Sequence, residues 1–97
     1  MQLNISGHHL DITPALREHS TEKLSKIKHH FDHVIKVNMI LEVQKDVQKA
    51  EATIHVSGAD LFAKAQSNDM YASIDQLVNK LDSQIIKHKE KLHSHRG

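Results

Sequence analysis

Three lysines in the last third of the chain have the type and spacing needed to bind phosphate groups. Lys80, Lys87 and Lys91 are separated by seven and four residues. On a helix with 3.6 residues per turn they fall within about 40° of one another and form one ridge, whereas Asp75 and Asp82 cluster on another flank. Cations separated from acids in this way suit contact with a nucleic-acid backbone. The alternative interpretation is an ordinary solvated helix end.

The distribution of charge along the chain also favours an anionic partner. The whole sequence has a net charge of only +1, from 13 basic and 12 acidic residues. The segment from Lys80 to the C-terminus, however, contains five Lys or Arg residues and only two acids. Lys23 and Lys26 add a smaller basic flank in the first third of the chain. A local basic surface on a nearly neutral protein is typical of a protein that binds an anionic partner.

The ten histidines raise the hypothesis of a metal site. His29 and His33 are four residues apart, which suits two ligands on one helical face if the helix extends that far. The chain contains no cysteine and no HExxH pattern, and the sequence offers no clear third ligand. We therefore predict no metal cofactor, only adventitious binding at His29 and His33. A histidine-rich metal-binding protein remains the alternative function.

The sequence gives no pattern for a catalytic site. Its three glycines form no phosphate-binding loop, and no serine, histidine and aspartate are spaced as a nucleophile elbow or triad. The acid pairs Glu18/Glu22 and Asp75/Asp82 have helical spacing and are expected on solvated faces. We predict that the protein is not an enzyme and uses no cofactor and no small-molecule substrate.

Hydrophobic periodicity predicts the elements that would position these residues. Alternating apolar and polar residues indicate strands, and longer repeats of three and four residues indicate helices. Thr13-Pro14 and Asn68-Asp69 are typical helix starts. The predicted order is β-α-β-β-β-α, with strands over 2–7, 34–45, 49–56 and 61–66 and helices from Pro14 to about Phe31 and from Met70 to about Leu92.

Each predicted strand has one apolar and one polar face, so helices should cover the sheet on one side only. Each helix has a single apolar stripe, formed by Leu16, Ser20, Leu24, Ile27 and Phe31 in the first and by Met70, Ile74, Leu77, Val78, Leu81, Ile85 and Leu92 in the second. We predict a two-layer α+β fold with a four-stranded sheet. A right-handed first crossover would place the first strand parallel to the second.

The polar face of the sheet is predicted to carry two large apolar residues, Ile40 and Phe62. We interpret them as a cross-strand pair rather than a binding site. Only three aromatic residues occur in the chain, so readout of single-stranded bases by stacking is not expected.

Length and composition indicate one domain over residues 1–97, with a flexible tail from about residue 93. No apolar run approaches the roughly 20 residues of a membrane span. The first residues lack the basic and apolar regions of a signal peptide. We expect a cytoplasmic protein that does not contact a membrane.

Several segments resemble one known family. The most specific is the stretch from Asn68 to Asp75, which reads NDMYASID. Others are 1–7, 12–18, Phe31-Asp32, Lys80-Leu81 and 87–92. Together they resemble the ribosome hibernation promoting factors, also called the ribosome-associated inhibitor or protein Y family, in their short form without the extra dimerisation domain.

The resemblance implies a fold like that of a double-stranded-RNA-binding domain, and a protein that binds the small ribosomal subunit in the channel used by messenger and transfer RNA. Such a protein inhibits translation and favours inactive ribosome dimers in stationary phase, where a second factor could act with it. The implied partners are the small subunit and its ribosomal RNA. The positions that match the family's RNA-binding residues are Lys23, Lys26, Lys80, Lys87, Lys89 and Lys91.

Overall fold

The computed structural model describes residues 2–30 and 33–94, and the side chains of all of these except 30 and 92–94. Phe31, Asp32 and the side chain of Leu92 therefore lie outside the described residues, as does the predicted tail beyond 94. The last helix itself continues to Ser94, two residues past its predicted end.

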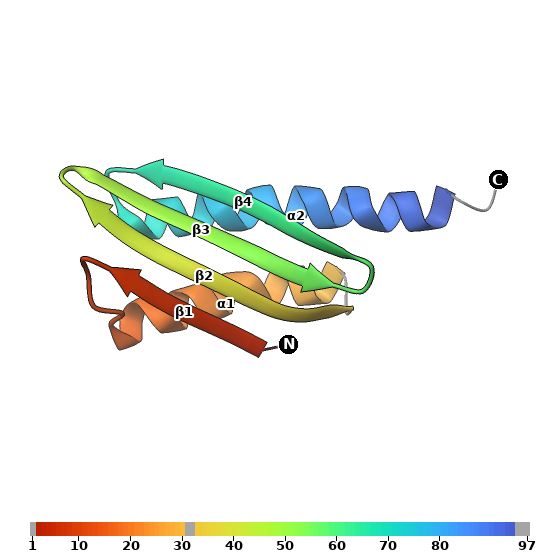
Figure 1. Cartoon of the computed structure of the whole chain (residues 1–97), viewed down its shortest axis with the longest axis horizontal. Coiled ribbons are helices and arrows are strands. Elements are labelled where there is room, and N and C mark those ends of the chain that lie inside the picture. Colours follow the sequence, from red (N-terminus) through yellow and green to blue (C-terminus); the bar gives the residue numbers. More distant parts are fainter. Residues whose placement is uncertain (1, 31–32, 95–97) are drawn as a thin grey trace.

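The chain forms a two-layer α+β fold, as predicted. Its elements are β1 (Gln2–His8), α1 (Pro14–His30), β2 (Val34–Gln44), β3 (Val47–Val56), β4 (Ala59–Ser67) and α2 (Met70–Ser94). The strands form one sheet in the order β1-β2-β3-β4, and β1 pairs parallel with β2 as predicted. Both helices cover the same face, and α2 projects beyond the end of the sheet (Figure 1). Among the described residues no helix combines the length and apolar character required to cross a bilayer.

Both helices begin at the predicted capping residues. The Thr13 hydroxyl accepts a hydrogen bond from the Leu16 N–H at 3.1 Å. The Asp69 carboxylate accepts one from the Ala72 N–H at 3.0 Å. Each side chain thus satisfies one of the amide groups that have no partner within the first helical turn.

The two hairpin turns are tighter than predicted. Lys45 and Asp46 alone connect β2 to β3, so Val47 and Gln48 belong to the strand rather than to the turn. Lys45 adopts a φ of 55°, in the left-handed region that a tight turn requires. Ser57 and Gly58 similarly connect β3 to β4, with Gly58 at a φ of 88°. The fourth strand therefore begins at Ala59, two residues before its predicted start at Leu61.

The core lies between the sheet and the two helices. Its fully buried side chains include Leu24 and Ile27 of α1, Met39 and Ile54 of the sheet, and Leu77 of α2. Small side chains at Ala50, Ala52, Ala63 and Ala65 are also buried on the inner face, as the alternating pattern predicted. They let the helices approach the middle of the sheet closely.

Two buried serines differ in their hydrogen bonding. The Ser20 hydroxyl is buried with no hydrogen-bond partner among the described residues. The Ser73 hydroxyl, in contrast, donates to the Gln48 carbonyl at 2.6 Å and lies 2.8 Å from the Ser67 hydroxyl. Removing each oxygen should therefore have opposite effects on stability.

We expect Ser20→Ala to raise the free energy of unfolding by about 0.5–1 kcal/mol, because it removes an unpaired buried polar group and favours the helix. Ser73→Ala should lower it by about 1–2 kcal/mol, because the Gln48 carbonyl loses its donor. Urea unfolding followed by circular dichroism measures both values. Equal effects of the two substitutions would contradict this interpretation.

Candidate nucleic-acid interface

Three lysines follow one flank of α2, as predicted. Lys80, Lys87 and Lys91 are all exposed, and we call them the basic ridge. The ridge lies on the side of α2 that faces β4, since Lys80 and Gln84 both reach the backbone of that strand. Lys87 and Lys91 line an open groove between α2 and Leu61 at the start of β4. They belong to the half of α2 that extends toward its projecting end (Figure 1).

The fold holds the ammonium group of Lys80 in place. Its Nζ donates a hydrogen bond to the Lys64 carbonyl at 2.8 Å. The side chain remains exposed, so the charge is available to solvent while its position is fixed. Lys80 thus combines an anchoring role with its place in the ridge.

Lys89 does not lie on the basic ridge. It follows Lys80 by nine residues, which at about 100° per residue places it on the opposite side of α2. That flank also carries Asp75 and Asp82, and through Asp75 it contacts α1. The six lysines predicted to bind RNA therefore do not form one continuous patch.

The flank of α1 that carries Lys23 faces the acidic flank of α2. Asp75 Oδ1 lies 2.8 Å from His19 Nε2 and 3.9 Å from Lys23 Nζ. The His19 ring also contacts Tyr71 edge-on, with ring centroids 5.0 Å apart. Part of the positive charge of Lys23 is thus compensated within the protein, whereas Lys26, one turn further along, is exposed.

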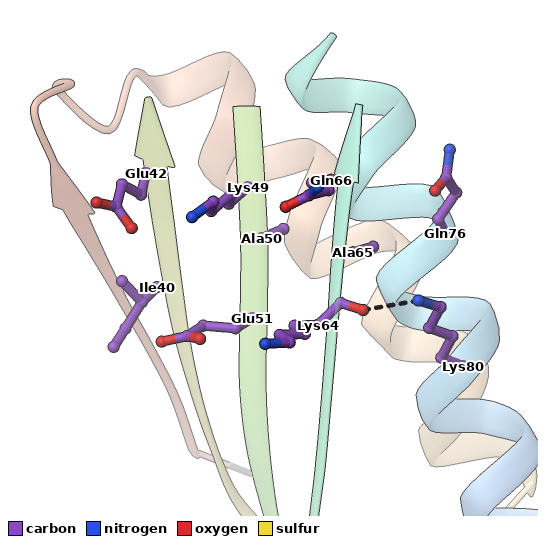
Figure 2. A pocket seen from close by; sticks show the side chains of 10 residues that line it. All are labelled: Ile40, Glu42, Lys49, Ala50, Glu51, Lys64, Ala65, Gln66, Gln76 and Lys80. Atoms are coloured by element: carbon purple, nitrogen blue, oxygen red, sulfur yellow. Dashed lines mark hydrogen bonds between the residues drawn. The ribbon is translucent and has the colours of Figure 1, made fainter. Parts of the chain in front are cut away.

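The open face of the sheet carries charges of alternating sign (Figure 2). Glu42 of β2 is the register partner of Lys49 of β3, and Glu51 of β3 is the partner of Lys64 of β4. Opposite charges side by side across a sheet neutralise one another. This face is therefore a weaker site for phosphate groups than the basic ridge.

The prediction that Ile40 and Phe62 form a cross-strand pair is wrong. Ile40 of β2 is opposite Glu51, and Phe62 of β4 is opposite Thr53. The two apolar residues are on strands separated by β3 and in different rows of the register, so they are not neighbours across a strand pair. Phe62 remains 51% exposed.

A row of polar side chains in contact with one another crosses all four strands on the same open face. Asn4 donates from Nδ2 to the Asn38 Oδ1 at 3.1 Å, and Asn38 Nδ2 lies 3.4 Å from His55 Nε2. His55 Nδ1 in turn lies 2.7 Å from Asp60 Oδ1. No local sequence pattern predicts these contacts, because they depend on the register of three strand pairs.

The described residues give no support to a metal site. The α1 helix ends at His30, and His33 lies in the turn before β2, so His29 and His33 do not share a helical face. Within residues 2–30 and 33–94, no three His, Asp or Glu side chains are grouped as metal ligands. The spacing argument for the two histidines therefore fails, because it required a longer helix.

Gln84 and His19 are two residues of this region that sequence reasoning did not single out. Gln84 donates from Nε2 to the Phe62 carbonyl at 2.7 Å, and it follows Lys80 by one helical turn. That spacing is visible in the sequence, but its target on β4 is not. The His19–Asp75 contact joins residues 56 positions apart, and no local pattern predicts it.

Comparison with known proteins gives consistent matches over nearly the whole chain. Residues 3–93 match the family described as Sigma 54 modulation protein / S30EA ribosomal protein. A protein of Azotobacter vinelandii named ribosome hibernation promoting factor is 57% identical over 91 residues, which is 94% of this chain and 85% of that protein. A protein of the same name from Escherichia coli K12 is 46% identical over 95 residues, which is 98% of this chain and 100% of that protein.

Solved structures agree with these sequence matches. A ribosomal subunit interface protein from Coxiella burnetii is 33% identical with a TM-score of 0.88, over 93% of this chain and 99% of that chain. The N-terminal domain of Thermus thermophilus Protein Y has a TM-score of 0.85 at 24% identity, over 91% of this chain and 99% of that chain. The second likeness shows the fold alone.

Proposed function

Because the chain belongs to the Sigma 54 modulation protein / S30EA ribosomal protein family, we propose that it is a ribosome-associated hibernation factor. Relatives that it matches along most of their length are named ribosome hibernation promoting factors. The Coxiella burnetii protein of the same fold is named a ribosomal subunit interface protein. A factor that associates with ribosomes works in the cytoplasm, without catalysing a reaction.

We further propose that the protein binds the small ribosomal subunit in the channel used by messenger and transfer RNA. Its dimensions of 50 × 21 × 17 Å describe an elongated body, which suits the blocking of a channel. The lysines would neutralise phosphates of ribosomal RNA, and the folded body would exclude the other RNAs. Inhibition by occlusion requires no catalytic group.

The single observation that carries the mode of binding is the basic ridge of α2. Lys87 and Lys91 are exposed and lie on the opposite side of α2 from Asp75 and Asp82, and two lysines outweigh the one acid, Glu90, that lines the same groove. We therefore assign them the main phosphate contacts. Lys80 and Lys26 are exposed as well and would extend the contact. Lys23 lies where the two helices meet, and Lys89 lies on the side of α2 opposite the ridge. We propose that both contribute at the edge of the interface.

Ribosome dimerisation in stationary phase, with the help of a second factor, is the physiological outcome that we propose. The family membership supports it, since relatives are named for promoting hibernation. Occupation of the small subunit by one copy of the protein would be the first step.

Co-sedimentation with purified small ribosomal subunits tests this function. We expect saturable binding near one copy per subunit, and competition by transfer RNA. The logarithm of the binding constant should fall with the logarithm of the salt concentration, by roughly one unit of slope per phosphate contact. Absence of binding at low salt, or binding unaffected by transfer RNA, would contradict the proposal.

A further inference from the structure

The β4 strand is an outer strand of the sheet, so one side of its backbone has no neighbouring strand among the described residues. Such an edge can pair with a strand of another molecule. The strand is nine residues long, contains no proline or glycine, and its central part reads LFAKA. Its length and composition therefore permit further strand pairing.

Two side chains of α2 occupy this edge. Lys80 Nζ donates to the Lys64 carbonyl at 2.8 Å, and Gln84 Nε2 donates to the Phe62 carbonyl at 2.7 Å (Figure 2 shows the first of these). Backbone groups of alternate residues in an edge strand point away from the sheet. The carbonyls of Phe62 and Lys64, two residues apart, are thus the acceptors that an additional strand would use.

The spacing of the helix matches the spacing of the strand. Residues four apart on a helix are about 6 Å apart along its axis, and residues two apart on a strand are about 6.6 Å apart. Lys80 and Gln84 can therefore reach Lys64 and Phe62 at the same time, with the helix running antiparallel to the strand. Gln76, one turn earlier, lines the same hollow as Gln66, the next outward residue of β4 (Figure 2).

We propose that Lys80 and Gln84 act as an edge cap that prevents β4 from pairing with β4 of a second copy of this chain. A second copy is the fitting competitor, because two antiparallel β4 edges are self-complementary about a two-fold axis. The cap opposes this pairing in two ways. The cap occupies the carbonyls of Phe62 and Lys64. It also holds the Lys80 ammonium group at the edge, where it would repel Lys80 of the second copy.

The double substitution Lys80→Ala/Gln84→Ala removes both donors and tests the edge cap. We expect the variant to self-associate at least about tenfold more tightly than the unsubstituted protein, since two carbonyls become available for hydrogen bonds between strands. Sedimentation velocity over a range of concentrations measures this association. Concentration-dependent amide shifts in NMR spectra should be largest at residues 59–67.

The matched control is Asn79→Ala/Lys89→Ala, because Asn79 and Lys89 lie on sides of α2 that do not face β4. It also removes one amide and one lysine from exposed positions of α2, and it should associate no more than the unsubstituted protein. Lys80→Arg should likewise retain a donor and prevent association. If the double variant does not fold, as judged by circular dichroism, Gln84→Ala alone opens one carbonyl and should give an intermediate increase.

Three results would overturn the edge cap: no increase in association for any of these variants, the same increase in the control, or shifts centred outside β4. The experiment contains no ribosomes, so its outcome is independent of the proposed function. If the cap variants associate as expected but the protein does not bind small subunits, only the proposed function fails. If the protein binds small subunits but the cap variants do not associate, only the edge cap fails.

Discussion

Lys87→Glu/Lys91→Glu is expected to weaken binding to the small ribosomal subunit at least about a hundredfold at moderate salt. The variant loses two phosphate contacts and presents two negative charges to an RNA backbone. The slope of log binding constant against log salt should also decrease by about two units. Stability should change by about 1 kcal/mol or less, because both side chains are exposed.

The control for this variant is Lys28→Glu/Lys45→Glu. Both pairs of reversals take the net charge of the chain from +1 to −3, and Lys28 and Lys45 are exposed as well. Lys28 lies on α1 and Lys45 in the β2–β3 turn, away from the basic ridge. Co-sedimentation should show a much smaller loss for the control. Equal losses would mean that net charge, rather than the ridge, determines affinity, and the assignment of Lys87 and Lys91 would be wrong.

The helices and their buried faces were predictable because their signals are local. The caps at Thr13 and Asp69 each involve a residue and an amide three positions later. The apolar stripe of α2 repeats every three or four residues, and its members from Met70 to Ile85 are all buried. Local periodicity therefore fixed both the position of the helix and the face that it presents to the sheet.

The turn boundaries were predicted less well because the turn residues give an unusual signal. Lys45 has a positive φ, although glycine and asparagine are the usual residues in that conformation. Tertiary pairing of Val47 and Gln48 with β2 outweighs the local preference of this lysine. Sequence propensity alone consequently suggested a longer turn.

The contacts that hold individual lysines of the candidate site in place are long-range, and no sequence pattern predicts them. Helical geometry correctly grouped Lys80, Lys87 and Lys91, but it did not predict that Lys80 is held by the Lys64 carbonyl. Nor did it predict that Lys23 approaches Asp75 across the interface of the two helices. Such contacts follow only from the packing of the completed fold. Lys80 and Lys23 therefore contribute to contacts within the protein as well as to its basic surface.

Ile85→Ala is expected to lower the free energy of unfolding by about 2–5 kcal/mol. Ile85 is fully buried in the hydrophobic core, and its truncation removes apolar contacts and leaves a cavity. A domain of this size has a total stability of about 5–15 kcal/mol. The loss should lower the melting temperature by about 10 °C or more, which thermal unfolding followed by circular dichroism will measure.

The next residue provides the matched control, since Ile86 is an isoleucine of the same helix with 42% of its surface exposed. Ile86→Ala removes the same atoms but leaves no cavity, and alanine favours the helix, so stability should change by about 1 kcal/mol or less. A large loss for both variants would mean that the outer flank of α2 is also buried, for instance in a self-associated form. A small loss for both would mean that the end of α2 contributes little to the core. In that case the end of α2, which contains Lys87 and Lys91, would become ordered only on the ribosome. The free energy of binding would then include the cost of ordering this segment.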